Sequence, residues 1–255
     1  MKVVILAGGL GTRLAEETEV KPKPMVEIGG YPILWHIMKT YSHYGFKEFF
    51  IALGYKGEII KKFFLDYCNL NGNMTIDFST GQTEIRERES EDWVLHLVET
   101  GQNSMTGGRI KRLENHLRDA PFMVTYGDGV SDIDLRKLFE FHKSHGKLAT
   151  VTAVHPPARY GELLINEDFT TEFTEKPQTH EGWINGGFII FEPQVLDYLN
   201  DDSSVMERDA LERLADEKQL MAYRHDGFWQ CMDTLRDKKF LESLWDNGNP
   251  TWKVW

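Results

Sequence analysis

Short apolar runs alternate with amphipathic stretches along most of the chain, and this alternation limits the possible folds more than any other feature. The first run, Lys2–Ala7, is rich in β-branched residues and almost uninterrupted by polar ones, which is typical of a strand buried on both faces. Strands that alternate with helices imply βαβ crossovers and therefore a mostly parallel sheet. We therefore expect an α/β fold with helices flanking that sheet.

The predicted elements follow from apolar periodicity and from the turn residues between them. Six strands are predicted in the first part of the chain: Lys2–Ala7, Glu48–Leu53, Met74–Phe78, Trp93–Glu99, Pro121–Tyr126 and Leu148–Val154. Six helices are predicted: Pro32–Tyr44, Glu58–Cys68, Arg109–Leu117, Asp134–His145, Ser203–Lys218 and Thr234–Trp245. Three later strand-like runs lack long helices between them and indicate a smaller β-rich part: Glu162–Ile165, Thr171–Thr174 and Gly187–Phe191. The polar segment Thr80–Asp92 predicts an exposed hairpin or a protruding loop.

Composition excludes several classes of protein. The chain of 255 residues has no repeat or obvious linker, which favours a single domain over residues 1–255. Its formal net charge of -11 argues against a general binder of nucleic acid or anionic membranes. No apolar run approaches the roughly 18 residues of a transmembrane helix. The two cysteines form no CxxC pair, which favours a reducing, cytoplasmic location.

The most informative segment follows the first predicted strand. Gly8, Gly9 and Gly11 let the backbone approach a ligand closely, and consecutive backbone N–H groups there can bind an anion. Thr12 adds a hydroxyl group and Arg13 a guanidinium group suited to phosphate oxygens. Because ligands of open α/β sheets bind at the carboxyl ends of strands, we expect a phosphate site here rather than a plain turn.

Two common phosphate motifs do not fit this loop. No Walker A string occurs in the chain. A dinucleotide fingerprint that begins at Gly9 would need a third glycine where Leu14 stands. Its acidic residue would fall near Glu27, within an irregular stretch. The sequence therefore gives poor support to a dinucleotide site.

Basic and acidic side chains elsewhere could complete a phosphate site. Lys23 lies between two prolines, which stiffen the loop and reduce the entropy lost when its ammonium group binds an anion. Asp128 follows a predicted strand between two glycines, where it is either a turn residue or a ligand for Mg²⁺. Asp233 precedes the last predicted helix and is either a second carboxylate ligand or an N-cap, a role for which Thr234 competes.

Taken together, these motifs closely resemble those of the sugar-phosphate nucleotidyltransferases. The strings GGLGTR, KPKPM, YGDG, EKP, NGG and MDT occur in the order found in that family, over essentially the whole chain. The resemblance implies a Rossmann-like core that transfers a nucleotidyl group to a sugar 1-phosphate and releases pyrophosphate. The strings SMTGGR and FWQCMDTLRD resemble a cytidylyl-transferring branch. That branch implies CTP and glucose 1-phosphate as substrates, CDP-glucose as product, and a role in making bacterial surface polysaccharide such as O-antigen.

The resemblance also implies roles for individual positions. Four residues are implied to be catalytic: Arg13, Lys23, Asp128 and Asp233, the two aspartates as ligands of the Mg²⁺ cofactor. The nucleotide and sugar phosphate would be bound by a longer set: Leu6, Ala7, Gly8, Gly9, Leu10, Gly11, Thr12, Arg13, Lys23, Ser104, Thr106, Gly107, Arg109, Gly127, Asp128, Gly161, Glu175, Lys176, Asn185 and Gly186. Residues 1–155 would mainly bind nucleotide, residues 156–233 mainly sugar phosphate, and residues 234–255 would form a C-terminal helix and tail. A homo-oligomer is implied, with a hexamer as one form.

Three alternatives stay open at this point. A catalytically silent relative would be expected to lose Arg13, Lys23 or a metal aspartate, and all of these are present. A metal-dependent glycosyltransferase would lack the GGLGTR turn. Transfer of a uridylyl, thymidylyl or guanylyl group is the nearest alternative, because the choice of base depends on the resemblance of SMTGGR alone.

Overall fold

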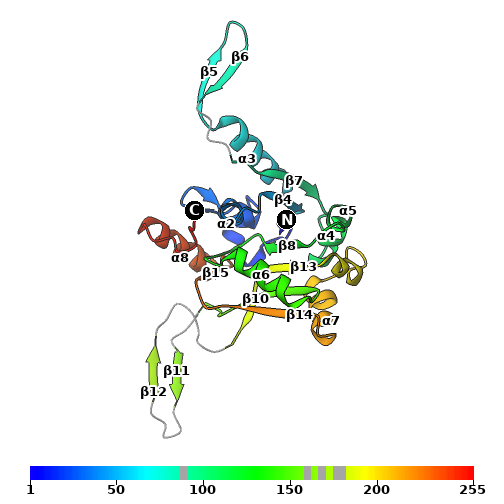
Figure 1. Ribbon diagram of the computed structural model, residues 1–255. Helices are drawn as coiled ribbons and strands as arrows, with labels where there is room; N and C mark the ends of the chain where they lie inside the picture. The colour runs from blue at the N-terminus through cyan, green and yellow to red at the C-terminus, as the bar shows by residue number, and fades with distance from the viewer. Residues whose placement is uncertain (87–90, 158–161, 166–170, 175–181) are drawn as a thin grey trace.

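A seven-stranded mixed sheet forms the centre of the computed structural model, which describes residues 1–86, 91–157, 162–165, 171–174 and 182–255. The strand order is β14-β10-β13-β8-β1-β4-β7. Neighbouring strands are parallel except at β13, which is antiparallel to both β8 and β10 (Figure 1). The strands are β1 Lys2–Leu6, β4 Glu48–Leu53, β7 Val94–Glu99, β8 Phe122–Tyr126, β10 Ala149–Val154, β13 Ile184–Phe191 and β14 Leu220–His225. The predicted α/β class and mostly parallel sheet are confirmed.

Both faces of the sheet are buried, which explains the continuous apolar runs in its strands. Alternate residues of β1 face opposite layers: Val3 and Ile5 pack in one core cluster, and Val4 and Leu6 in the other. The first layer contains α2 Ile33–His43, α3 Gly57–Leu70, α6 Leu135–His145 and α8 Leu235–Asp246. The second contains α4 Thr106–Arg112, α5 Glu114–Leu117, the 3-10 helix η3 Pro193–Tyr198, the π-helix η4 Met206–Glu212 and α7 Arg213–Asp216.

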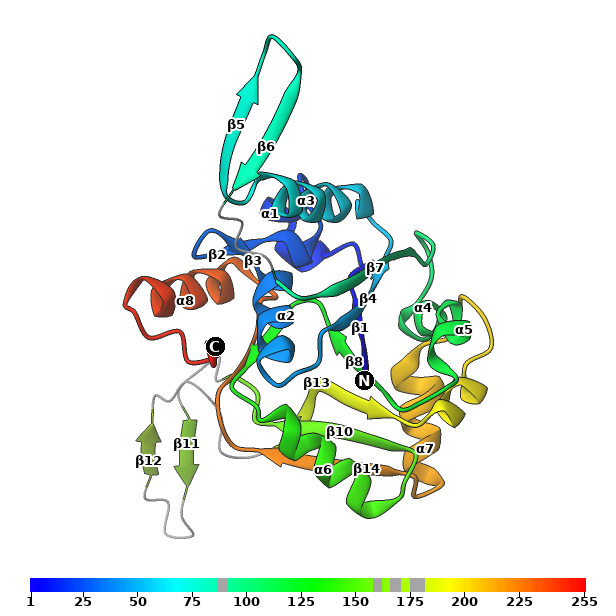
Figure 2. The ribbon, with the colours of Figure 1, turned by 45° about the horizontal axis from the view of Figure 1, so that its top comes forward.

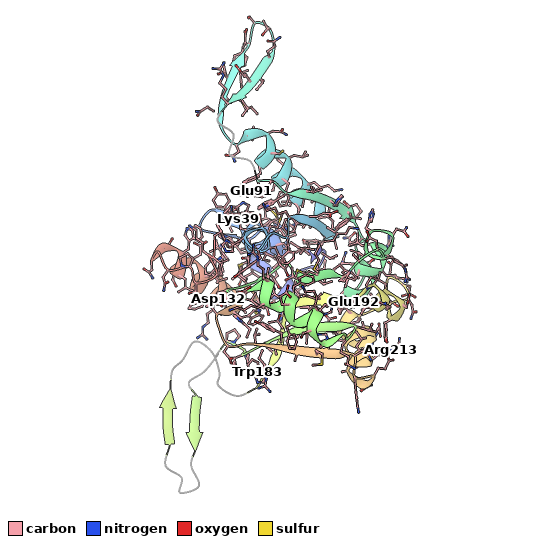
Figure 3. All side chains as sticks on the ribbon, viewed as in Figure 1. Lys39, Glu91, Asp132, Trp183, Glu192 and Arg213 are labelled. Carbon is pink, nitrogen blue, oxygen red and sulfur yellow. The ribbon has the colours of Figure 1, made fainter. Side chains whose placement is uncertain are left out.

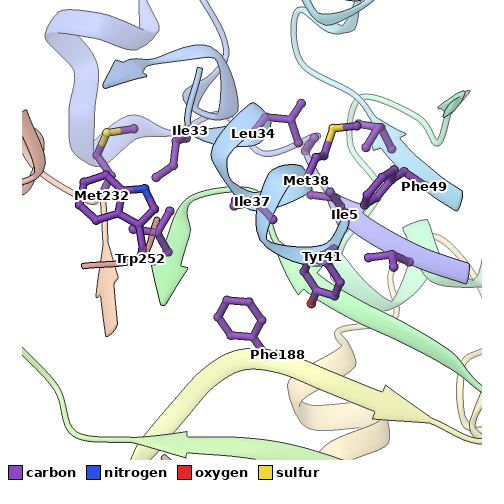
Figure 4. Close-up of a cluster of buried hydrophobic side chains, with 14 of the residues drawn as sticks. Ile5, Ile33, Leu34, Ile37, Met38, Tyr41, Phe49, Phe188, Met232 and Trp252 are labelled. Carbon is purple, nitrogen blue, oxygen red and sulfur yellow. The ribbon is translucent and has the colours of Figure 1, made fainter. Parts of the chain in front are cut away.

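The first layer is anchored by α2, which lies across the sheet with its apolar face inward. Figure 4 shows Ile33 of this helix on the side of Trp252 and Tyr41 on the side of Phe188, and both belong to the first core cluster. Tyr41 also stacks on Phe188 of β13, with ring centroids 5.9 Å apart. Side chains fill the space on both sides of the sheet (Figure 3). No helix in the described part of the chain is both long and apolar enough to cross a bilayer.

Two small hairpins extend from this body. Strands β5 Asn73–Asp77 and β6 Gln82–Arg86 form an exposed antiparallel pair that stands clear of the sheet (Figure 2). The predicted exposed segment Thr80–Asp92 therefore forms, as far as Arg86, the turn and second strand of a hairpin whose first strand is the predicted strand Met74–Phe78. Residues 87–90 lie outside the described residues. Strands β11 Glu162–Ile165 and β12 Thr171–Thr174 pair with each other in a separate sheet. Of the three later predicted strands, the third is part of β13 and joins the main sheet.

Two predicted helices have different boundaries in the structure. The predicted helix Arg109–Leu117 begins earlier, at Thr106, and is interrupted at Leu113 between α4 and α5. The added first turn packs closely on a neighbouring segment, because a Cβ on Gly108 would lie 2.6 Å from the backbone of Asp202. The predicted helix Ser203–Lys218 is shorter and begins as the π-helix η4.

Candidate active site

A pocket of about 350 Å³ opens at the carboxyl ends of β1 and β8, where the sequence predicted a ligand site. The residues that line it come from the glycine loop, the loop before α4 and the end of β8: Leu6, Ala7, Gly8, Gly9, Gly11, Arg13, Lys23, Pro24, Ser104, Met105, Thr106, Arg109, Tyr126, Gly127 and Asp128. Parallel strands that end at one edge of the sheet bring these distant segments together.

The glycine loop has the backbone geometry that its sequence predicted. Gly11 has a φ of +65°, a conformation that favours glycine, and a Cβ there would lie 2.9 Å from Thr18. The chain then enters a 3-10 turn at Thr12, η1 Thr12–Leu14. Leu10 and Thr12 are exposed and do not line the pocket.

Four ionised side chains meet beside this loop, and we call Arg13, Lys23, Asp128 and Asp233 the charged cluster. The Nζ of Lys23 donates to Asp128 Oδ2 and to Asp233 Oδ1, each at 2.5 Å. The Nη1 of Arg13 donates to Asp233 Oδ2 at 2.6 Å. Lys23 and Asp233 are buried, whereas the Arg13 side chain is 70% exposed. The two aspartates and the lysine predicted from distant motifs therefore share one site.

Backbone pairing fixes the position of the two aspartates. The short strands β9 Gly129–Ser131 and β15 Trp229–Cys231 are antiparallel, with Gly129 opposite Cys231. The backbone N–H of Met232 donates to the carbonyl of Asp128 at 2.8 Å. Asp233 does not cap the last helix, because Thr234 does so in a capping box with Asp237. This leaves the Asp233 carboxylate for the charged cluster.

The same two carboxylates determine the charge state of Lys23. Burial alone would lower the pKa of its ammonium group, but Asp128 and Asp233 outweigh burial and raise that pKa above its usual value. Because the Asp128 and Asp233 carboxylates both contact the Lys23 ammonium group, they converge on one cation. That donor set suits Mg²⁺, which takes one or two carboxylates and completes its shell with water and substrate phosphates. Within the described ranges, no group of three or more His, Cys, Asp or Glu side chains could hold a metal by itself.

Arg109 lines the pocket, but its guanidinium donates hydrogen bonds within the protein, mostly to backbone carbonyls. Its guanidinium donates to the carbonyls of Leu53, Gly101 and Gly8 at 3.0, 2.7 and 3.0 Å. It is buried, and a Cβ on Gly8 would lie 2.2 Å from Arg109 Nη1. Burial lowers the pKa of this guanidinium. Arg109 therefore connects the glycine loop to the end of β4 and stiffens the wall of the pocket.

A second polar network lies where α4, β8 and η4 meet. Thr106 Oγ1 donates to Glu207 Oε2 at 2.7 Å, and Tyr126 Oη donates to Glu207 Oε1. The amide of Asn185 donates to Tyr126 Oη at 3.3 Å, so Asn185 reaches this network from β13. The sequence predicted Thr106 and Asn185 as binding residues but missed Tyr126 and Glu207. Tyr126 stands in the YGDG string and could have been found there, whereas Glu207 lies in no motif.

The other predicted residues occupy three kinds of position. Ser104 and Gly127 line the pocket. Gly107 faces away from it, since a Cβ there would lie 2.8 Å from Leu199, and Gly186 packs against Val154. Gly107 is required for close packing of the helix, and it does not line the pocket. The predicted residues Gly161, Glu175 and Lys176 lie outside the described residues.

Comparison with known proteins finds relatives that cover this chain over its full length. A glucose-1-phosphate cytidylyltransferase of Salmonella typhimurium is 51% identical over 256 aligned residues, with all of both chains covered. A probable glucose-1-phosphate cytidylyltransferase of Bacillus subtilis is 43% identical over the full length of both. The crystal structure of HddC from Yersinia pseudotuberculosis complexed with GMP-PN superimposes with a TM-score of 0.69 at 25% identity, covering 96% of this chain and 99% of that one. The family model described as nucleotidyl transferase matches residues 2–237, and the chain therefore belongs to the nucleotidyltransferase family.

Proposed function

We propose that this protein transfers CMP from CTP to α-D-glucose 1-phosphate, forming CDP-glucose and releasing pyrophosphate. The observation that carries the proposal is the charged cluster, in which Lys23 contacts both Asp128 and Asp233 beside the glycine loop. Relatives 51% and 43% identical over their whole length carry the name of this activity, which supports CTP over other nucleotides. A silent relative is disfavoured because none of the cluster's charges is lost.

The reaction requires two anions to meet. A phosphate oxygen of glucose 1-phosphate attacks the α-phosphorus of CTP in line, and the bond from that phosphorus to the pyrophosphate oxygen breaks. Pyrophosphate leaves with the bonding electron pair. The attacking phosphate is already ionised near neutral pH, so neither a covalent nucleophile nor a general base is needed. Catalysis then depends on positioning and electrostatic stabilisation, as in phosphoryl transfer generally.

Arg13 and Lys23 supply positive charge in this scheme. Arg13 is mostly exposed and is able to turn from Asp233 toward a triphosphate, whose backbone contacts would come from Gly8, Gly9 and Gly11. Lys23 is held in place by its prolines and both carboxylates, and it offsets charge near the reacting phosphates. Asp128 and Asp233 would hold Mg²⁺, which supplies Lewis-acid stabilisation of phosphate charge when bound.

Asn185 is the described residue that we assign to the sugar side of the site. Asn185 lies beside Tyr126, at the side of the pocket nearest β13. The predicted contacts of Glu175, Lys176 and Gly161 with glucose 1-phosphate stay predictions, as do the division of binding at residue 155, the cytoplasmic location and the role in surface polysaccharide.

Assembly is also part of the proposal. We infer a homo-oligomer, a hexamer among the possible forms, because the β5–β6 hairpin exposes apolar side chains that a lone subunit leaves in water. Ile76 is 47% exposed and Phe78 is 92% exposed. Light scattering coupled to size exclusion would measure the mass, and a mass near 29.6 kDa would contradict the inference.

The function is tested by pyrophosphate release with glucose 1-phosphate, Mg²⁺ and each of CTP, UTP, dTTP, ATP and GTP in turn. Release chiefly with CTP is expected. Release chiefly with another nucleotide would overturn the choice of base while keeping the reaction class. No release with any of them would move the proposal to another sugar phosphate or to a silent subunit.

A further inference from the structure

Two hydroxyl groups of the pocket share one carboxylate that the proposed reaction does not use. Thr106 stands at the first turn of α4 and Tyr126 at the end of β8, and both line the pocket. Each places its hydroxyl on a different oxygen of Glu207, which lies on the π-helix η4 behind them. We call Thr106 and Tyr126 the hydroxyl wall.

The chemistry of the partners fixes the direction of every hydrogen bond in this network. A carboxylate only accepts, so both hydroxyl groups must donate to Glu207. Thr106 Oγ1 also accepts from the backbone N–H of Met206 at 2.9 Å. Asn185 Oδ1 accepts from the N–H of Gly187 at 2.9 Å, which orients its Nδ2 as a donor toward Tyr126. Burial and the Glu207 carboxylate raise the pKa of Tyr126, so its hydroxyl keeps its proton.

A hydroxyl group has only one proton to give. Because the hydroxyl groups of Thr106 and Tyr126 both donate their protons to Glu207, neither can also donate a hydrogen bond to a ligand. Each oxygen also accepts one hydrogen bond from the protein, Thr106 Oγ1 from Met206 and Tyr126 Oη from Asn185, so what it has left for a ligand is a lone pair. A ligand group that forms a hydrogen bond with either oxygen must therefore be a donor. A carbonyl oxygen in the same place would face another acceptor and would form no hydrogen bond.

We propose that Glu207 is a specificity-determining positioning residue, which holds Thr106 and Tyr126 as acceptors so that this wall selects a substrate carrying a donor group. The proposal rests on the proposed function, which supplies the candidate donors. The exocyclic amino group of cytosine is one, and uracil carries a carbonyl at that position. A hydroxyl group of the ribose or of glucose 1-phosphate is the other source of the same chemistry.

The test compares Glu207→Gln with a matched control, Glu212→Gln, which makes the same change at an exposed position of the same helix. Glutamine keeps the shape of the side chain but donates through its amide nitrogen. One hydroxyl of the wall then recovers its proton and is able to pair with a carbonyl. We expect Glu207→Gln to lower the ratio of kcat/KM for CTP to that for UTP by about tenfold, and Glu212→Gln to leave it unchanged.

Parallel readouts distinguish the two sources of the donor. A change in the CTP to UTP ratio identifies the base amine. An unchanged ratio with a rise of about tenfold in KM for glucose 1-phosphate, or a smaller preference for CTP over dCTP, identifies a sugar hydroxyl. The melting temperature and its shift on adding CTP or UTP with Mg²⁺ are measured for every variant, because they report binding without turnover.

One result would overturn the inference. If Glu207→Gln matched Glu212→Gln in all of these selectivity ratios and KM values, whether or not its melting temperature fell, Glu207 would be a structural residue only. Thr106→Val and Tyr126→Phe provide an independent check, because each removes one hydroxyl and should change the same ratio as Glu207→Gln. The nucleotide preferred by the wild-type protein tests the proposed function, whereas the change between wild type and variant tests Glu207.

Discussion

The two ends of the pocket are built from opposite kinds of polar contact. In the charged cluster, Lys23 and Arg13 contact carboxylates directly at 2.5 to 2.6 Å. At the hydroxyl wall, Thr106 and Tyr126 are neutral and a single carboxylate behind them orients both. Full charges act on any phosphate, whatever base it carries, whereas oriented hydroxyl groups distinguish a donor from an acceptor. We therefore expect rate and selectivity to depend on separate groups of residues.

The largest effect is expected in the charged cluster. Asp233→Asn removes the charge that both Lys23 and Arg13 contact, and it weakens the proposed metal site. We expect kcat to fall about 100- to 1000-fold with CTP and with UTP alike. Steady-state kinetics measure this, with Asp246→Asn on the exposed end of α8 as the control. Turnover within about twofold of wild type would remove Asp233 from the mechanism.

The next effect concerns Arg109, which lines the same pocket and which its contacts assign to the scaffold. Arg109→Met removes a buried guanidinium that donates to the carbonyls of Leu53, Gly101 and Gly8, and the Gly101 carbonyl loses its donor. We expect a loss of about 3 kcal/mol in the free energy of unfolding. Urea denaturation measures it, and Arg112→Met provides the control because Arg112 is an exposed residue of the same helix. Unchanged stability together with a much higher KM for CTP would instead make Arg109 a ligand contact.

A smaller effect is expected at Arg13. Its side chain is 70% exposed, so its ion pair with Asp233 adds little to stability. Arg13→Ala should raise KM for CTP about tenfold and leave the melting temperature nearly unchanged. Isothermal titration with CTP and Mg²⁺ measures the affinity. A loss of affinity of about tenfold for CTP and for UTP alike in the Thr106→Val variant would contradict the separation of the two ends, since Thr106 carries no charge.

The smallest effect is a pH dependence of stability. The pKa of Lys23 is raised in the folded protein, so its contribution to stability is complete below the unfolded value of 10.5. That contribution is lost as pH rises through the folded pKa. The free energy of unfolding should therefore fall more steeply above pH 10.5 in wild type than in Lys23→Met. Lys62→Met, an exposed control, should follow wild type, and parallel curves for all three proteins would refute the raised pKa.

Sequence reasoning was most successful where one local pattern determines the structure. The apolar run Glu48–Leu53 is a strand with the predicted boundaries, because a strand buried on both faces tolerates few polar residues. The turn at Gly11 was predictable because only a few residue types adopt its backbone conformation. Asp128 and Asp233 could be proposed as partners through the family resemblance, and the structure brings both to Lys23.

The remaining features depend on contacts between distant segments. Strand β14 was not predicted, since its partly exposed residues Leu220–His225 give no clear apolar pattern. Glu207 was missed because its role follows from Thr106, 101 residues away, and from Tyr126, 81 residues away. A carboxylate on a helix is usually a solvated side chain, and only the tertiary structure shows that this one faces two hydroxyl groups.

The most direct test of the account measures kcat/KM for CTP and for UTP in wild type, Lys23→Met and Glu207→Gln side by side. We predict that Lys23→Met lowers both values by a similar large factor and leaves their ratio unchanged, because the ammonium group of Lys23 is bonded to the two carboxylates of the charged cluster. Glu207→Gln should reduce the ratio about tenfold with a smaller loss of turnover. A changed ratio in Lys23→Met would contradict the separation of rate from selectivity. An equal loss for both nucleotides in Glu207→Gln, with KM for glucose 1-phosphate unchanged, would contradict it as well.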